Sequence, residues 1–272
     1  MKNYHFILLL ILLGGCRTAQ VDTHGDNSDT NIPIREYSIQ SVLWQQLSGE
    51  YKALCYQAFN LAKFQLDNML LEKDEKGKPL AIITDIDETV LDNSSFNAKM
   101  IETDEEYSKD NWKRWGKLER AAAVPGALEF LKYAESKGVQ IFYISNRYVE
   151  QEEETKANLR KLGFPFIDEQ HILLRANTSG KEERRDIVLE ENQVVMLIGD
   201  NLSDFADVFD DKSTDERNEI VANWKHKFGT SFIVLPNPMY GDWETKGLYE
   251  GKYNWTAVQK DSIRKVKLIS IR

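Results

Sequence analysis

The chain has 272 residues, of which 42% are hydrophobic and 29% are charged, so it is long enough for one well-buried domain with an insertion or for two small domains. Its formal net charge is −9, which argues against a nucleic-acid polymer or an anionic membrane surface as the partner of the folded domain. The same negative field would repel an anionic substrate, and a phosphate site therefore needs local cations, either a metal ion or Lys and Arg side chains.

The N-terminal stretch predicts export. Lys2 precedes an unbroken apolar run over residues 6–13, which is too short to span a bilayer but suits the core of a signal peptide. The run leads into Gly14-Gly15-Cys16, which resembles the bacterial lipobox. We expect residues 1–15 to be a lipoprotein signal peptide and Cys16 to become the acylated first residue of an exported, membrane-anchored chain. The alternative is an ordinary secretory signal in which Cys16 has no role.

The next segments predict a tether followed by helices. Residues 16–35 are polar and rich in Thr, Asp and Asn, as in a flexible lipidated tether, and residues 36–272 are expected to form the folded domain. Apolar residues recur at roughly helical spacing over residues 37–72, where Gly49 is expected to separate two helices. Cys55 lies within this pattern, which indicates a buried, unreactive thiol.

Five short, nearly continuous apolar runs predict strands that are buried on both faces of a parallel sheet. They cover residues 80–84, 139–144, 172–174, 194–198 and 232–235. Helical patterns lie between them: one has Pro125 in its first turn and ends at Gly138, and others cover residues 152–162 and 181–191. This alternation predicts a doubly wound α/β domain. Residues 92–124 interrupt the first crossover without a strand pattern, and we expect them to form an inserted helical cap.

Polar clusters follow the predicted strands, at the point where each strand ends or on the loop just beyond it. The clusters are Asp85 and Asp87, Ser145 and Asn146, Lys181, and Asp200 and Asp204. Because open α/β sheets bind ligands beyond the carboxyl ends of their strands, we expect these groups to converge on one rim. Taken singly, each has an ordinary explanation, since an Asp-x-Asp pair usually belongs to a solvated loop and a Lys-Glu-Glu-Arg-Arg run to an exposed helix face.

The clusters resemble the four motifs of the haloacid dehalogenase (HAD) superfamily, here Asp85-Ile86-Asp87-Glu88-Thr89, Ser145, Lys181 and Gly199-Asp200-Asn201-Leu202-Ser203-Asp204. Longer strings are similar to those of the class C nonspecific acid phosphatases, which are lipoprotein phosphatases and 5′-nucleotidases of the bacterial outer membrane. These strings include Leu91-Asp92-Asn93-Ser94, Tyr143-Ile144-Ser145-Asn146-Arg147 and Leu235-Pro236-Asn237-Pro238-Met239-Tyr240-Gly241-Asp242-Trp243. The resemblance covers most of residues 80–240, and the lipobox fits class C better than the soluble class B enzymes.

The resemblance implies a nucleophile, an acid–base group and a metal. Asp85 would attack phosphorus and form an aspartyl-phosphate, while Asp87 would protonate the leaving oxygen and later activate water. Magnesium would bind Asp85, the backbone carbonyl of Asp87, and Asp200, and Asp204 would hold that shell in place.

The resemblance also implies a phosphate-binding set. Ser145, Asn146 and Lys181 would surround the phosphoryl oxygens, and Lys181 would offset the repulsion between an anionic substrate and the carboxylates. Ser145 could instead only cap a turn. Arg184 matches a family position as well, and its role stays open between catalysis and a salt bridge.

The implied substrate is a small phosphomonoester, with a nucleoside 5′-monophosphate as the expected case. Two aromatic clusters could select it, one in the cap and one after the last strand. We expect Trp112 and Tyr240 to contact the nucleobase, while Trp115 and Trp243 could equally pack the cap against the core.

Asp-x-Asp-Glu-Thr favours a phosphatase, because dehalogenases and P-type pumps of the superfamily lack the second carboxylate. The rival interpretation is a non-catalytic, surface-binding lipoprotein that kept the fold, but such a protein would be expected to lose Asp85 or Asp87, and both are present. The sequence leaves a homodimer open, and the resemblance implies the outer membrane as the place of the lipid anchor.

Overall fold

The computed structural model describes residues 32–72 and 77–271, and the part from Ile32 onward forms one compact unit. The predicted signal peptide, Cys16 and residues 17–31 of the predicted tether lie outside the described residues. In the part of the chain that the structure describes, no helix has the length and apolar character needed to cross a membrane.

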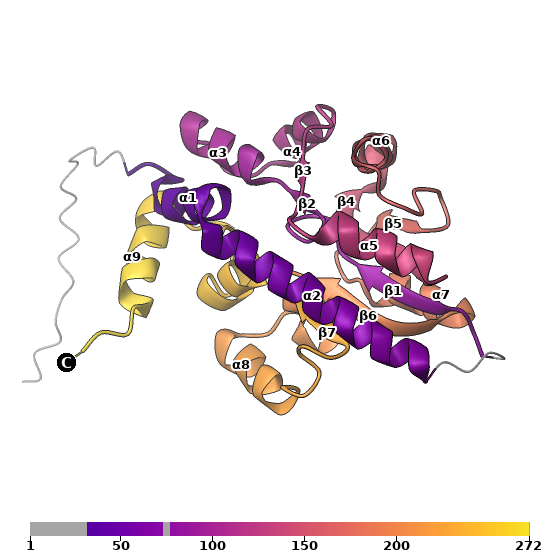
Figure 1. Ribbon diagram of the computed structural model, residues 1–272. Helices are drawn as coiled ribbons and strands as arrows, with labels where there is room; N and C mark the ends of the chain where they lie inside the picture. The colour runs from indigo at the N-terminus through magenta and orange to yellow at the C-terminus, as the bar shows by residue number, and fades with distance from the viewer. Residues whose placement is uncertain (1–31, 73–76, 272) are drawn as a thin grey trace, which may run out of the picture. The chain divides into compact units, whose positions relative to one another are not determined.

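A five-stranded parallel sheet forms the centre of the domain (Figure 1). In spatial order its strands are β5 (Ile172–Arg175), β4 (Gln140–Tyr148), β1 (Leu80–Thr84), β6 (Gln193–Gly199) and β7 (Phe232–Val234). The chain builds outward from β1 first through β4 and β5, and then on the other side through β6 and β7. This reversal beside β1 opens a crevice at the carboxyl ends of the strands. The predicted α/β fold and its five strands are confirmed.

The first strand shows why the sheet is buried on both faces. Leu80 and Ile82 belong to the main core, while the alternate residues Ala81 and Ile83 pack in a second cluster on the other face. The main core receives side chains from α2 (Gly49–Leu71), α5 (Ala127–Ser136) and α6 (Glu152–Leu162), and the second cluster from α7 (Glu182–Glu191). Figure 1 shows α2 and α5 side by side on one face of the sheet. Helices on both faces explain the continuous apolar runs.

The N-terminal helical region divides close to the predicted position. After the short 3-10 helix η1 (Glu36–Ser38), α1 (Ile39–Leu47) ends at Ser48, and α2 begins at Gly49. Ser48 has an extended backbone, and its side chain accepts a hydrogen bond from the N–H of Tyr51, which caps α2. Cys55 lies buried on the core face of α2.

The segment between β1 and α5 contains the helices α3 (Ser94–Thr103) and α4 (Lys109–Gly116). The expectation that it holds no strand was wrong. The segment begins at β2 (Leu91–Asp92) and ends at β3 (Ala122–Ala123), which pair antiparallel beneath the two helices. Strands of two residues are too short to show an alternating pattern.

The start of α5 also differs from the expectation. Pro125 precedes the helix and does not lie in its first turn, because Gly126 has a φ of 87° and the helix begins at Ala127. Glycine adopts this left-handed conformation without strain, so residue 126 can form the turn between strand and helix.

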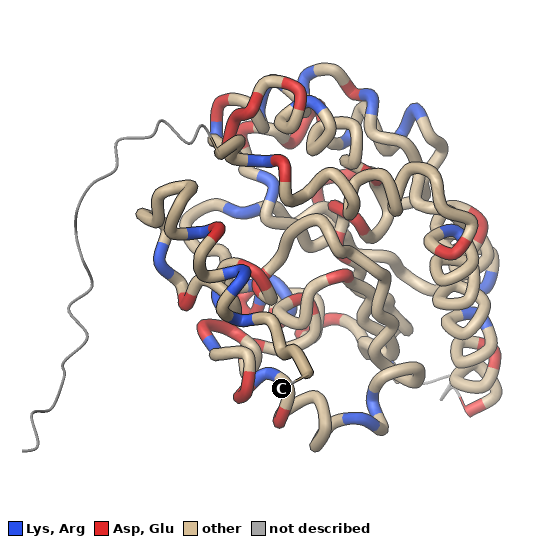
Figure 2. Tube along the Cα trace, turned by 90° about the vertical axis from the view of Figure 1, so that its left-hand side faces the viewer, with Lys and Arg blue, Asp and Glu red and all other residues tan. Residues whose placement is uncertain are grey.

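Besides β7, the chain after β6 contributes several helical segments. They are η3 (Leu202–Asp204), η4 (Asp207–Phe209), α8 (Thr214–Asn223), the π-helix η5 (Trp243–Leu248) and α9 (Ala257–Lys267). Earlier in the chain, the 3-10 helix η2 (Val149–Gln151) precedes α6. Figure 2 shows acidic and basic residues interspersed along the helices. The excess of acidic residues behind the net charge of −9 is therefore not concentrated on one helix in that view.

Candidate active site

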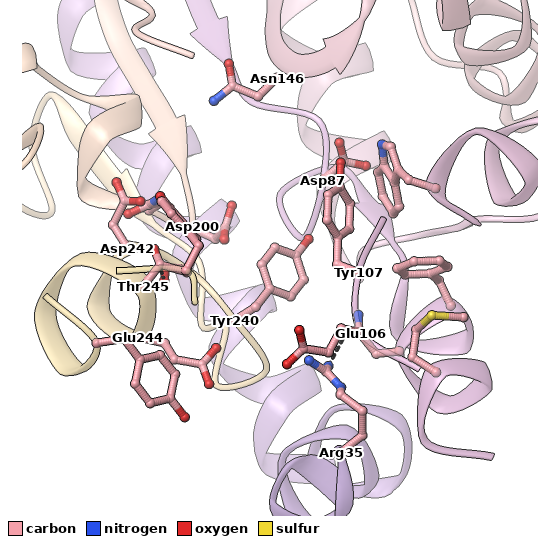
Figure 3. Close-up of a pocket in the computed structure, with 18 of the residues that line it drawn as sticks. Arg35, Asp87, Glu106, Tyr107, Asn146, Asp200, Tyr240, Asp242, Glu244 and Thr245 are labelled. Carbon is pink, nitrogen blue, oxygen red and sulfur yellow. Dashed lines mark hydrogen bonds between the residues drawn. The ribbon is translucent and has the colours of Figure 1, made fainter. Parts of the chain in front are cut away.

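The polar clusters meet at the carboxyl edge of the sheet, around a cavity of about 560 Å³ (Figure 3). Asp85 directly follows β1, and its backbone N–H donates to the carbonyl of Ile198 in β6 at 2.9 Å, so the neighbouring strand fixes the start of the loop. Six of the seven residues of the polar clusters line the cavity, namely Asp85, Asp87, Asn146, Lys181, Asp200 and Asp204. Ser145, the seventh of that group, is fully buried beside Asp87.

Lys181 supplies a cation at what we call the inner end of the cavity, where it meets Asp85, Asp200 and Asp204. It stands at the N-cap of α7 and is 4% exposed, and its Nζ donates to Asp85 Oδ1 at 2.5 Å and to Asp204 Oδ1 at 2.7 Å. Burial lowers the pKa of Lys181, but the carboxylates of Asp204 and Asp85 outweigh burial and hold that pKa above its ordinary value. The ammonium group therefore stays charged between the two carboxylates.

Three carboxylates offer a metal site. Asp85, Asp200 and Asp204 each place one oxygen within 4.8 Å of the other two, and Asp200 accepts hydrogen bonds from Thr89 Oγ1 and Asn237 Nδ2 at 3.1 and 2.8 Å. Burial raises the pKa of Asp85 to about 7, against the opposing effect of the nearby ammonium, and burial raises the pKa of Asp200 well above its ordinary range. The cluster is short of positive charge, and its all-oxygen donor set fits a hard divalent cation such as Mg²⁺.

Asp204 can lie in this cluster because residue 199 is a glycine and leaves space for its side chain. A Cβ atom on Gly199 would lie 2.4 Å from Asp204 Oδ2 and 2.5 Å from its Cβ, closer than real Cβ atoms approach. The N–H of Asn201 donates to Asp204 Oδ2 at 2.9 Å, and Arg185 donates to the backbone carbonyl of Asp204 at 3.1 Å. The sequence analysis expects Asp204 to hold the metal shell in place, and in the structure one of its oxygens lies within 4.8 Å of an oxygen of Asp85 and of Asp200.

Asp87 is paired with an arginine that the sequence reasoning missed. Arg147 Nε and Nη2 donate to Asp87 Oδ1 at 3.0 and 2.8 Å, and the arginine is only 2% exposed. Its guanidinium carbon also lies 5.5 Å from the centre of the Trp112 ring. A signal was available, because Arg147 stands two residues after Ser145 in the same strand, and alternate residues of a strand point to the same side.

Ser145 and Asn146 point in different directions from the end of β4. Ser145 Oγ donates to Asp87 Oδ2 at 3.3 Å and accepts the N–H of Arg147 at 3.1 Å. Arg184 donates to the carbonyl of Ser145 at 2.6 Å and to Asn146 Oδ1 at 2.9 Å. Since guanidinium is only a donor, this contact orients the Asn146 amide with its nitrogen away from Arg184. Among the described residues Arg184 forms no ion pair with a carboxylate, so it braces the loop.

Aromatic side chains stand between the inner end and the mouth of the cavity. Trp112 is 8% exposed and packs edge-on against Phe96, with ring centres 5.0 Å apart. Figure 3 shows the ring of Tyr240 reaching into the cavity from the loop after β7, toward Tyr107 and Asp87. Trp243 is largely exposed and donates its indole N–H to the carbonyl of Tyr240 at 3.2 Å, so it supports the loop from outside.

The outer end of the cavity joins segments that are far apart in the sequence. Arg264 of α9 lies 4.0 Å from the ring centre of Tyr37 in η1, and donates to the hydroxyl of Tyr249 at 2.9 Å. Lys260 of α9 forms an ion pair with Glu106, which lies between the cap helices α3 and α4. Sequence reasoning missed these residues because no strand end or motif marks them.

Together these groups suit attack on a phosphate ester. A buried carboxylate, an adjacent ammonium, an oxygen-rich metal cluster and a second carboxylate meet in one cavity. Such an arrangement offers a nucleophile, an acid–base group and positive charge for an anionic transition state.

Comparisons with known proteins agree with this geometry. The family described as HAD superfamily, subfamily IIIB (Acid phosphatase) matches residues 10–243. The structure of the class C acid phosphatase from Bacillus anthracis is 43% identical, covers 89% of this chain and 100% of its own, and superposes with a TM-score of 0.84. A crystal structure of the class C acid phosphatase from Bacillus anthracis with tungstate bound is also 43% identical, covers 87% of this chain and 98% of its own, and has a TM-score of 0.83.

A curated relative matches over a shorter region. The stem 31 kDa glycoprotein of Glycine max is 29% identical over 161 residues, and the chain spans 57% of that protein's length. The family match covers well over half of the chain, and the resemblance noted in the sequence is thereby confirmed. The chain belongs to subfamily IIIB of the HAD superfamily, among the class C acid phosphatases.

Proposed function

We propose that the protein is a magnesium-dependent phosphomonoesterase that forms an aspartyl-phosphate on Asp85 and prefers nucleoside 5′-monophosphates. The observation that carries the proposal is the position of Asp85 within one cavity. Lys181 and the carboxylates of Asp200 and Asp204 lie beside it, and Asp87 lines the same cavity. This arrangement supports Asp85 as the nucleophile, with Lys181 near to bind phosphate and Asp87 to protonate the leaving oxygen.

The reaction follows from the chain's own side chains. A carboxylate oxygen of Asp85 attacks phosphorus, the ester P–O bond breaks, and Asp87 gives its proton to the leaving oxygen. Asp87 then removes a proton from the water that attacks the aspartyl-phosphate, which releases inorganic phosphate and regenerates Asp85. Acid–base assistance of this kind contributes ~10²–10⁴ in rate.

The metal role rests on the oxygen donors of the inner end. Asp85, Asp200 and Asp204 would hold Mg²⁺ through carboxylate oxygens, and the backbone carbonyl of Asp87 is the further ligand that the family implies. When bound, the ion supplies positive charge that stabilises the phosphoryl group during transfer. Thr89 and Asn237 keep Asp200 oriented for this task through their hydrogen bonds.

Phosphate binding is assigned to Lys181, Asn146 and Ser145. Lys181 Nζ lies 2.5 Å from the attacking carboxylate, so it would be adjacent to any phosphoryl oxygen bound there. Arg184 leaves the Asn146 nitrogen free to donate into the cavity. Ser145 is fully buried in this structure and bonded to Asp87, so its contribution to phosphate would require that hydroxyl to turn.

The nucleotide preference is supported by the aromatic walls. Trp112 and Tyr240 both line the cavity beyond the carboxylates, and a base stacked on aromatic side chains gains ~1–3 kcal/mol in nucleic-acid sites. Tungstate, bound by the related protein from Bacillus anthracis, is a tetrahedral oxyanion like phosphate. The aromatic walls favour a planar leaving group, and the tungstate of the related protein favours a phosphoryl group in the substrate.

Anchoring is a separate proposal, supported by Gly14-Gly15-Cys16 and by the resemblance to a family of outer-membrane lipoproteins. We infer that the protein is exported and held in the outer membrane through a lipid on Cys16. Mass spectrometry of the native protein should find the acylated cysteine, and Cys16→Ser should abolish the attachment. An unmodified Cys16 would refute the anchor.

A chain beginning near Asn31 should be soluble and active, and its mass in solution would decide between monomer and homodimer.

Hydrolysis of p-nitrophenyl phosphate with and without chelator tests the proposed chemistry. We expect activity with Mg²⁺, loss of activity in excess chelator and recovery when Mg²⁺ is added back. Full activity in chelator would exclude the metal mechanism. If a panel of nucleotide, sugar and aryl phosphates stayed intact in the presence of Mg²⁺, the rival interpretation as a non-catalytic binding lipoprotein would gain support.

A further inference from the structure

Asn93 is a fully buried amide that uses all of its hydrogen-bonding capacity next to the active site. Its Nδ2 donates to Asp87 Oδ1 at 2.8 Å and to the carbonyl of Leu91 at 3.4 Å. Its Oδ1 accepts from Trp115 Nε1 at 2.8 Å and from Arg147 Nη2 at 3.4 Å. An asparagine amide has two N–H donors and one oxygen with two lone pairs, so each group is occupied.

This use of Asn93 differs from the usual task of an asparagine at the start of a helix. Asn93 is the N-cap residue of α3, where its side-chain oxygen would ordinarily accept a backbone N–H of the first turn. No such bond is formed, and Asp92 Oδ1 accepts the N–H of Ser94 at 2.8 Å. The amide of Asn93 is thereby free to face Asp87.

Trp115, with the shorter contact, and Arg147 together set which way that amide points. An indole nitrogen is only a donor and a guanidinium is only a donor, so both contacts require the amide oxygen on their side. The amide nitrogen is left to face Asp87, which as a carboxylate accepts. A reversed amide would place its oxygen against the Asp87 oxygens and its N–H groups against two donors.

The consequence for Asp87 is that its two oxygens have different surroundings. Oδ1 receives three N–H groups, from Asn93 Nδ2, Arg147 Nη2 and Arg147 Nε, at 2.8, 2.8 and 3.0 Å. Oδ2 has only the longer contacts with Arg147 Nε at 3.2 Å and Ser145 Oγ at 3.3 Å. Oδ2 is therefore the less fully hydrogen-bonded oxygen, and the one with room for the proton that the proposed reaction transfers.

We propose that Trp115 is a positioning residue for the acid–base carboxyl of Asp87: by holding the Asn93 amide, the cap helix α4 keeps Oδ1 saturated and directs Oδ2 to the leaving oxygen. The inference rests on the proposed function, in which Asp87 donates that proton as the ester P–O bond breaks and the bond from Asp85 to phosphorus forms. The cap thus acts on the chemistry through a hydrogen bond, in addition to covering the cavity.

The alternative is that Trp115 only packs, since its ring lies 6.3 Å from that of Phe96, centre to centre. The two readings differ in which substrates they affect. An aryl phosphate such as p-nitrophenyl phosphate releases a phenolate that is stable without a proton, whereas an alkyl phosphate needs the acid. A packing defect would slow both, while a misdirected acid slows the alkyl ester.

Trp115→Phe keeps a ring in place and removes the N–H. We expect its kcat/KM to fall roughly five- to ten-fold for an alkyl phosphate and less than about two-fold for p-nitrophenyl phosphate, at saturating Mg²⁺. The ratio kcat/KM is the proper readout because it contains only the steps up to departure of the leaving group. Trp224→Phe is the matched control, since Trp224 packs between Phe209 and Phe232, and it should leave both ratios unchanged.

A double-mutant cycle shows whether Trp115 acts through Asp87. In an Asp87→Asn background the acid is already gone, so adding Trp115→Phe should change kcat/KM for the alkyl ester less than about two-fold. An equal loss in both backgrounds, or an equal loss for both substrates, would overturn the proposal, as would an unchanged Trp115→Phe enzyme with a wild-type melting temperature. If the wild-type protein hydrolyses neither ester with Mg²⁺, the proposed function itself fails, a result distinct from these.

Discussion

The two ends of the cavity are built in different ways. At the inner end, Asp85, Lys181 and Asp204 stand at a strand end, a helix start and the end of the short 3-10 helix η3, and each is less than a tenth exposed. At the outer end the walls come from the cap, the loop after β7 and α9, and Tyr107 there is 55% exposed. The inner end is fixed by the sheet and by buried charge pairs, whereas the outer end rests on loops and surface ion pairs.

This difference indicates a division of labour. Groups on the rigid strands would carry the steps common to every phosphate ester, and groups on the loops would decide which ester is accepted. Substitutions at the inner end should therefore affect all substrates alike, and substitutions at the outer end should affect some substrates only.

The largest effect is expected for Asp85→Asn. The amide keeps the shape of the side chain but cannot attack phosphorus, so turnover should fall by at least about 10³-fold on every substrate. Steady-state rates on a nucleotide and on an alkyl phosphate measure the loss. Circular dichroism and the melting temperature should show an intact fold. Rates near those of the wild type would remove Asp85 from the role of nucleophile.

Lys181→Met should cost both rate and stability. Removal of a group that stabilises an oxyanion typically lowers kcat by ~10²–10³-fold. Without the ammonium, Asp85 and Asp204 remain buried and unpaired, which costs about 3 kcal/mol or more in the metal-free protein.

The stability loss of Lys181→Met should shrink when Mg²⁺ is added, because the ion replaces the missing positive charge. Lys156→Met is the matched control, since Lys156 is also buried in an ion pair, with Glu152, but on α6. Its melting temperature should fall equally with and without Mg²⁺. A magnesium-independent loss in Lys181→Met as well would contradict the charge-balance account.

In the metal-free protein the contribution of Asp85 to stability should fall as pH rises from about 4 to about 7. Burial raises the pKa of Asp85 to about 7 in the folded state, against ~3.9 for an unfolded aspartate, so the folded chain binds the extra proton across this range. Stability from this proton is full below the unfolded pKa and is lost as pH passes the folded pKa.

Melting temperatures measured in chelator and in Mg²⁺ across that pH range test whether the carboxylate cluster lacks positive charge. The metal should stabilise the protein more at the upper end of the range than at the lower end, because Mg²⁺ favours the ionised carboxylates. A stabilisation by Mg²⁺ that does not vary with pH would show that these carboxylates are ionised without it.

The substitution Tyr240→Ala tests whether the outer end of the cavity selects the substrate. Loss of a stacking partner should raise KM for nucleoside 5′-monophosphates by roughly ten-fold, since each ~1.4 kcal/mol is a factor of ten. A small aliphatic phosphate should be almost unaffected, because it has no ring to stack. Equal losses on both substrates would make Tyr240 a packing residue and would weaken the contrast between the two ends.

The smallest effect is expected for Lys260→Ala. The ion pair between Lys260 and Glu106 joins α9 to the cap at the surface, and exposed pairs contribute typically ~0.2–1 kcal/mol. The melting temperature should fall slightly, and kcat/KM should change less than about two-fold on any substrate. A large loss of activity would show that the outer wall controls more than access.

The sequence predicted the inner end well because the fold places it by a simple rule. Apolar runs identify buried strands, and a polar residue directly after such a run must lie at the carboxyl edge of the sheet, as Asp85 and Asp200 do. The short strands β2 and β3 escaped notice because two residues cannot display a period.

The partners of Asp87 and the contacts of the outer end could not be predicted in this way. Only the folded chain shows that the guanidinium of Arg147 and the amide of Asn93 both donate to Asp87. Glu106 and Lys260 are 154 positions apart, and hydrophobic periodicity reports burial but not which surface segments meet.

The contact between Tyr37 and Arg264 links an early segment of the chain to a late one, and this has a consequence for the order of assembly. A chain emerging from N- to C-terminus would complete the sheet through β7 and Asn237 before α9 exists. The carboxylates and Lys181 could then already be in place while the mouth of the cavity is still open. On this account the chain acquires its reactive groups first and completes the mouth of the cavity last.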